Sequence, residues 1–141
     1  MVNKNELLME KLKVFFNKKN NKDILINVLN NNYEISLRII DWFVTNYCKK
    51  YNIGWIVDNV QFVVYINYKL QLKGYSKKYF DPFCRRDRIF FHYGEEKKHL
   101  ITTVGQLNFF KWMIENNIID YIKKHYIEIE SDMHNTIKNT H

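Results

Sequence analysis

Glycine and proline are scarce in this chain, and their scarcity limits the folds that it can adopt. Pro82 is the single proline among 141 residues, and only four glycines accompany it. Sandwiches and barrels join many short strands through turns that need these residues, so we expect helices to dominate. Hydrophobic residues make up 46% of the chain, enough for one sizeable core. We expect residues 1–130 to form a single globular domain and residues 131–141 a polar, frayed tail.

Apolar residues recur at helical spacing in several segments. The clearest helix covers residues 37–51, where Leu37, Ile40 and Val44 step by three or four behind a capping Ser36. Further helices are predicted after Asn5, over residues 24–29, after Thr103 and at residues 118–122, with breaks at residues 17–22, 30–32 and 116–117.

Residues 64–73 fit two patterns. Apolar and polar residues alternate, which is typical of a strand. Tyr65, Tyr68 and Leu72 instead step by three and four, which is typical of a helix. A helix capped at Asp58 or the next residue would be about twenty residues long, more than a strand usually spans. We therefore favour the helix, while the strand stays open as the alternative.

The best hairpin signal lies in the second half of the chain. Residues 88–93 and 98–103 are rich in β-branched and aromatic residues and flank a four-residue loop that contains Gly94. In the simplest register Tyr93 faces Lys98, His92 faces His99 and Phe91 faces Leu100. The expected fold class is thus α+β, mainly α-helical, with one β-hairpin. Helices followed by a hairpin also occur in winged-helix domains, which is an analogy of element order alone.

Residues 65–88 carry most of the positive charge of the chain. Seven basic side chains stand here against only Asp81 and Asp87, so this basic segment contributes +5 to a net charge of +7. A basic balance favours polyanionic partners, and clustered lysines and arginines are typical of phosphate contacts. The predicted nucleic-acid-binding residues are Lys69, Lys73, Lys77, Lys78, Arg85, Arg86 and Arg88.

Helical spacing would give part of this segment a defined geometry. On a helix, Lys69, Lys73 and Lys77 would stack along one flank in steps of about 6 Å. Such a ladder repels itself unless an anion neutralises it, and a phosphate backbone does so while releasing counterions. The arginines add planar forks that suit phosphate oxygens.

Each part of the basic segment also has a structural interpretation. The lysines could form a solvated helix face. The tyrosines could stack on bases, but we favour core residues with their hydroxyls at the surface. Asp81 and Asp87 could pair with the arginines and fix the loop around Pro82.

Catalysis and metal binding have little support in the sequence. Cys84 lies beside two arginines, but no base is positioned to activate it. His92 and His99 face each other in the predicted hairpin without further defined ligands, whereas zinc needs about four. We therefore expect a non-enzymatic protein without a cofactor.

The two cysteines, Cys48 and Cys84, form no CxxC motif, so we expect reduced thiols in an intracellular, reducing compartment. The longest apolar run, residues 62–66, is too short to span a bilayer, and no signal peptide is visible.

Aromatic residues suggest a second function. Phe109, Phe110 and Trp112 are so close in sequence that one helix face cannot bury all three. Interface cores are enriched in such residues. The alternative to nucleic-acid binding is therefore a structural or interaction protein that forms a homo-oligomer through aromatic surface.

Two stretches resemble a known group of proteins. They are residues 79–86, Tyr-Phe-Asp-Pro-Phe-Cys-Arg-Arg, and residues 102–112, Thr-Thr-Val-Gly-Gln-Leu-Asn-Phe-Phe-Lys-Trp. With Tyr68-Lys69 and residues 71–73 before them, they resemble small, functionally unassigned proteins of the nucleocytoplasmic large DNA viruses, the giant viruses. The resemblance implies a viral setting, either a replication site in the host cytoplasm or the virion. Of the two nucleic acids, we expect DNA rather than RNA as the partner.

Overall fold

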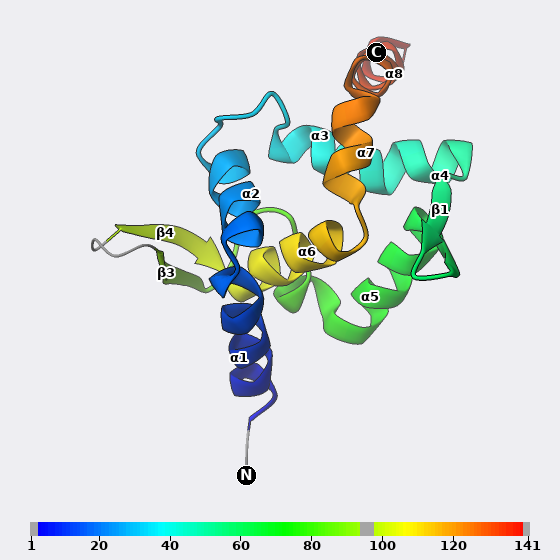
Figure 1. Cartoon of the computed structure of the whole chain (residues 1–141). Helices are drawn as coiled ribbons and strands as arrows, with labels where there is room; N and C mark the ends of the chain where they lie inside the picture. The colour runs from blue at the N-terminus through cyan, green and yellow to red at the C-terminus, as the bar shows by residue number, and fades with distance from the viewer. Residues whose placement is uncertain (1–2, 94–97, 140–141) are drawn as a thin grey trace.

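The computed structural model describes residues 3–93 and 98–139 and shows an α+β fold that is mainly helical (Figure 1). In chain order the helices are α1 (Lys4–Asn17), α2 (Lys19–Leu29), α3 (Leu37–Trp42), the π-helical turn η1 (Phe43–Tyr47), α4 (Cys48–Tyr51), α5 (Val64–Tyr79), α6 (Val104–Glu115), α7 (Ile118–Lys124) and α8 (Tyr126–Asn139). The strands are β1 (Gly54–Val57), β2 (Val60–Val63), β3 (Arg88–Tyr93) and β4 (Lys98–Thr103). They form two separate antiparallel hairpins.

Helix α6 is the centre of the core. It lies between α1 and α2 on one side and α5 on the other (Figure 1). Phe109, Phe110 and Trp112 are all at most 5% exposed. We expected that one helix face could not bury all three, and that part of this aromatic surface would remain for a partner. The second expectation was wrong, because neighbouring elements cover more than one face of α6. The aromatic residues of α6 therefore supply core and not an interface.

Capping signals placed two helices correctly. The Ser36 hydroxyl accepts a hydrogen bond from the Ile39 amide at 3.2 Å, and the helix predicted over residues 37–51 runs through α3, η1 and α4. The Thr103 hydroxyl accepts a hydrogen bond from the backbone amide of Gln106 at 3.0 Å and so caps the start of α6. Asn117, in the left-handed region at φ 61°, separates α6 from α7 as predicted.

The hairpin of β1 and β2 was not predicted. Its two-residue loop is Asp58 and Asn59, both at positive φ (49° and 66°), which matches the tight turns that favour Asp and Asn. We expected a helix cap here, and that prediction is wrong. Helix α5 begins only at Val64, directly after β2.

The helix favoured for residues 64–73 is confirmed, because α5 covers them. It also contains a kink. Ser76 has φ 62° and ψ 169°, a conformation that L-residues other than glycine rarely adopt. Gly74, two residues earlier, lies in regular helix.

The predicted register of the second hairpin is confirmed, with Tyr93 opposite Lys98, His92 opposite His99 and Phe91 opposite Leu100. Its loop, residues 94–97, lies outside the described residues. One face packs on the core through the buried Phe91 and Leu100.

The two ends of the chain differ in detail from the predictions. Asn3, not Asn5, caps α1, since its side chain accepts from the Asn5 amide at 2.8 Å. The break predicted at residues 17–22 is reduced to the junction at Lys18. Helix α8 continues through the expected tail to Asn139 and buries Met133. In the part of the chain that the structure describes, no helix is long and apolar enough to cross a membrane.

Candidate nucleic-acid interface

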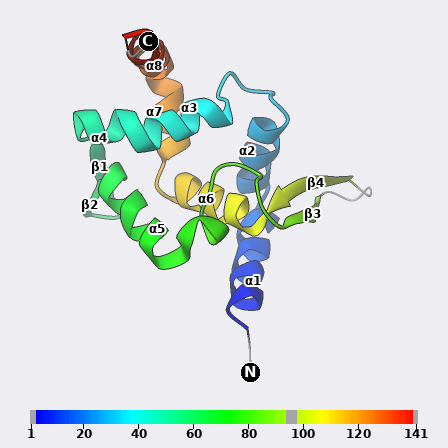
Figure 2. The ribbon, with the colours of Figure 1, turned by 180° about the vertical axis from the view of Figure 1, so that it is seen from behind.

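The seven predicted cations lie along α5, on the loop that follows it and at the start of β3. Figure 2 shows this loop crossing α6 on its way to β3. All seven residues are exposed. Among the residues that the structure describes, only Arg85 of the seven has a carboxylate within 4.0 Å. Six cations from one segment are thus free to meet an external anion.

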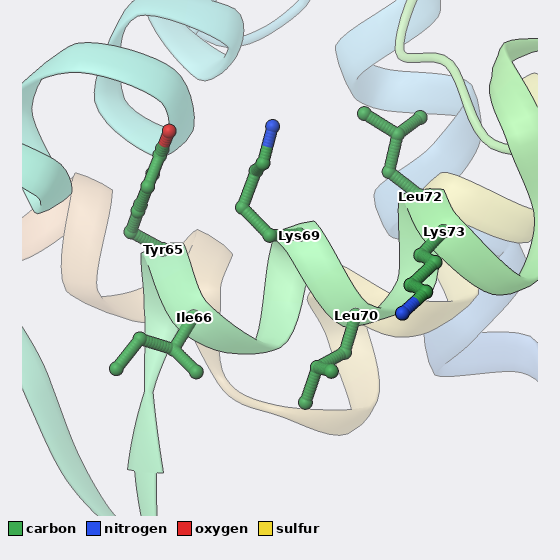
Figure 3. A pocket seen from close by; sticks show the side chains of 6 residues that line it. All are labelled: Tyr65, Ile66, Lys69, Leu70, Leu72 and Lys73. Carbon is green, nitrogen blue, oxygen red and sulfur yellow. The ribbon is translucent and has the colours of Figure 1, made fainter.

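The kink at Ser76 divides the lysines into two pairs. Lys69 and Lys73 precede it, and Lys77 and Lys78 follow it. Figure 3 shows Lys69 pointing in the same direction as Tyr65, whereas Lys73 points toward the side of Leu70. The structure does not form the continuous ladder that an unbroken helix would have produced.

The two lysines before the kink line an open groove on α5 of about 470 Å³, together with Ile66 and Leu70 (Figure 3). Ile66 is 58% exposed and Leu70 is 61% exposed. Beyond the kink, the ammonium of Lys78 lies 5.5 Å from the centre of the Tyr79 ring.

Arg85 has a structural role. Its Nε and Nη2 donate to the two oxygens of Asp81 at 3.0 and 2.9 Å, and Asp81 also accepts from the Phe83 amide at 3.3 Å. These bonds raise the pKa of Arg85. The pairing predicted for Asp81 is confirmed, whereas Asp87 makes no ion pair within the described residues. Arg85 is accordingly the weakest member of the predicted site.

The loop that carries the arginines is held to α6 by side-chain amides. Gln106 donates to the Pro82 carbonyl at 2.9 Å, and Asn108 donates to the Tyr79 carbonyl at 2.8 Å. Both amides are buried. Gly105 allows this close approach, because a Cβ there would lie 2.9 Å from the Lys78 carbonyl oxygen. The cations after the kink are therefore displayed from a fixed backbone.

An acidic group outside the basic segment, Asp41, also lies near its cations. Burial raises the pKa of Asp41 on α3, and the nearby charges of Arg85 and Lys77 act in the opposite direction. Asp41 therefore lies close enough to Arg85 and Lys77 to oppose part of their positive charge.

The outer face of the β3–β4 hairpin extends the site beyond the predicted residues. Arg88, Phe90 and His92 alternate on one face of β3, and His99 and Ile101 lie opposite them on β4. Phe90 is 64% exposed and contacts the His99 ring edge-to-face at 5.1 Å. The alternation of residues 88–92 was the sequence signal for this face, but we did not separate its two sides.

The tyrosines of α5 divide between core and surface. Tyr68 packs on Phe80, Phe109 and Trp112 at ring distances of 6.0 to 6.3 Å, which confirms the core interpretation for this residue. Tyr75 is 37% exposed. Among the tyrosines of α5, base stacking is thus open to Tyr75 and to the half-buried Tyr65 and Tyr79 at the two ends of the helix.

Other chemistry is sparse in the described residues. Burial raises the pKa of the Cys48 thiol, and Cys84 is half-buried. Within residues 3–93 and 98–139, no group of three or more His, Cys, Asp or Glu side chains could hold a metal ion.

Comparison with known proteins gives a family without an assigned activity. A relative from Acanthamoeba polyphaga mimivirus, "Uncharacterized protein L507", is 44% identical over 122 residues, which confirms the resemblance to unassigned giant-virus proteins. The match covers 81% of the chain and 47% of the relative, so the chain spans about half the length of the curated relative it matches. No solved structure matches the chain, and the winged-helix analogy remains an expectation. A family model matches residues 1–141 in full, and the chain therefore belongs to the "Family of unknown function (DUF7197)".

Proposed function

We propose that the protein is a non-enzymatic nucleic-acid-binding protein of a large DNA virus, which contacts mainly the phosphate backbone. The observation that carries this proposal is the set of six exposed, unpaired cations within one segment of the described chain. They are Lys69, Lys73, Lys77, Lys78, Arg86 and Arg88.

The arrangement of the backbone supports phosphate contact without base readout. The buried amides of Gln106 and Asn108 hold the loop in place, so less ordering is needed when Arg86 and Lys78 meet an anion. The fork of Arg86 suits two phosphate oxygens, and the lysines act as point charges. Backbone contacts of this kind fix position without reading sequence.

Salt dependence gives the first test. If each of the six cations replaces one condensed counterion, log K falls against log[salt] with a slope of about −5 on duplex DNA, or about 1,000-fold between 50 and 200 mM salt. A mobility-shift titration at several salt concentrations measures this slope. Absence of binding to both single- and double-stranded nucleic acid at low salt refutes the proposal.

A matched pair of variants locates the site. The triple variant Lys77→Gln, Lys78→Gln, Arg86→Gln should reduce the slope by about three, because each neutralised contact removes about one counterion. The control removes three exposed lysines from α1, α2 and their junction: Lys13→Gln, Lys18→Gln, Lys19→Gln. Equal loss in both variants would mean that net charge alone, and not this segment, governs binding.

A second function, self-association, is favoured by the exposed apolar residues of the outer hairpin face. Phe90 and Ile101 are cross-strand partners and are 64% and 57% exposed. Light scattering separates the two functions. A stable oligomer that is indifferent to nucleic acid, and that becomes monomeric in Phe90→Ser, would support self-association and contradict nucleic-acid binding.

A further inference from the structure

A cavity of about 440 Å³ lies between the first half of α1 and the kinked end of α5. Leu7 and Leu8 contribute from α1, and Tyr75 and Tyr79 contribute from α5. Its volume falls within the range of small-molecule sites, which are concave and largely apolar with a few polar groups. The cavity is distinct from the open groove on α5, although Lys73 borders both.

Positive charge surrounds this cavity. Lys4, Lys11 and Lys73 line it, and none of the described residues that line it is acidic. These three lysines form no ion pair within the described chain. Like charges around one concavity repel each other, and an anion bound there would remove the repulsion.

The backbone beside the cavity leaves it open. A Cβ at Gly74 would meet no atom within 4 Å outside its own helix turn, so packing does not require glycine at this position. Glycine is unfavourable within a helix, and its missing side chain preserves the space into which the cavity opens. Two residues on, Ser76 holds a conformation suited to glycine, and such strain clusters at ligand sites.

We propose that this cavity binds a nucleoside monophosphate. The phosphate would meet the lysines at the rim, and the base would lie against the rings of Tyr75 and Tyr79. The polar side chains of Asn5 and Ser76 line the cavity and suit the polar edge of a base, whereas an acyl chain offers them no hydrogen-bond partner. The inference does not depend on the proposed backbone binding, because two of its three cations come from α1.

The direct test is calorimetric titration of the protein with AMP, GMP, CMP and UMP. At least one nucleotide should bind about tenfold or more tightly than adenosine, inorganic phosphate or octanoate, because each lacks the base or the phosphate. Equal binding of inorganic phosphate would reduce the site to an anion patch, and tighter binding of octanoate would make it a lipid site. Either result, or no binding of any nucleotide, overturns the proposal.

Two variants separate this site from the basic segment. Gly74→Leu should fill the open space without removing a charge, and leucine suits a helix, so nucleotide binding should fall about tenfold or more. Lys4→Gln with Lys11→Gln should have a similar effect through the lost phosphate contacts.

Both cavity variants, Gly74→Leu and the double lysine variant, should still shift the mobility of DNA, because the six exposed cations of the basic segment are intact. The control, Lys13→Gln, lies on α1 outside the cavity lining and should bind nucleotide like the unmodified protein. Unchanged nucleotide binding in both cavity variants would show that the nucleotide binds elsewhere and would refute the assignment.

Discussion

Replacing Ser76 by glycine should stabilise the protein. Ser76 holds φ 62° and ψ 169°, and a non-glycine residue in this region costs about 1–3 kcal/mol. Glycine removes this strain but loses about 0.5–1 kcal/mol through its greater freedom in the unfolded chain. Ser76 is exposed, and its hydroxyl makes no hydrogen bond among the described residues, so little else changes. The net gain in the free energy of unfolding should be about 1 kcal/mol, or about 3 °C in Tm.

Thermal and urea denaturation followed by circular dichroism measure this effect. Ser131→Gly is the matched control, because Ser131 is also exposed but lies inside the regular helix α8. There glycine should lower stability by about 0.5–1 kcal/mol. If Ser76→Gly lowers stability as Ser131→Gly does, the positive φ at Ser76 is not a feature of the native protein, and the argument from strain fails.

Other substitutions test the packing and the ionised groups. Gly105→Ala should cost about 1–3 kcal/mol in urea denaturation, because its Cβ would lie 2.9 Å from the Lys78 carbonyl, whereas Gly74→Ala should gain up to about 1 kcal/mol. Cys48 is fully buried and its pKa is raised, so mass spectrometry should find it alkylated by iodoacetamide only after unfolding; rapid native labelling would contradict its burial. Burial raises the pKa of Asp132, but hydrogen bonds from a lysine and a tyrosine of α4 outweigh burial and lower it below 3.8. A carboxyl pKa that is lower in the folded than in the unfolded state stabilises the fold at pH values above the unfolded-state pKa. Asp132→Asn should therefore lower the free energy of unfolding at pH 7, and its difference from the unmodified protein should shrink as pH falls below 3.8.

Local signals predicted much of the fold because they act within a few residues. Ser36 and Thr103 cap their helices through bonds to the backbone three residues ahead, so the sequence alone places them. The register of the second hairpin followed from alternation and loop length. Where a signal has two meanings, prediction failed: Asp58 is suited both to a helix cap and to a tight hairpin turn.

Features that depend on distant contacts could not be predicted. The all-round burial of α6 depends on α1, α2 and α5, and its own sequence does not show which neighbours cover it. No proline marks the kink at Ser76, and the nearby Gly74 lies in regular helix. As a result, the sequence predicted which cations belong to the basic segment but not that Lys73 and Lys77 would fall on opposite sides of a break. The cavity beside the kink was missed because Lys4 and Lys11 are far from α5 in the sequence.

The burial of α6 also bears on the order in which the protein can fold during its synthesis. Helix α6 starts at Val104, and α1, α2 and α5 all contact it. While the ribosome makes residues 1–103, these helices have no central partner, and the buried faces of residues such as Leu12, Phe16 and Leu25 stay open to water. A nascent chain that stops before Val104 should therefore be a substrate for chaperones, and the cooperative core should form only once α6 leaves the exit tunnel.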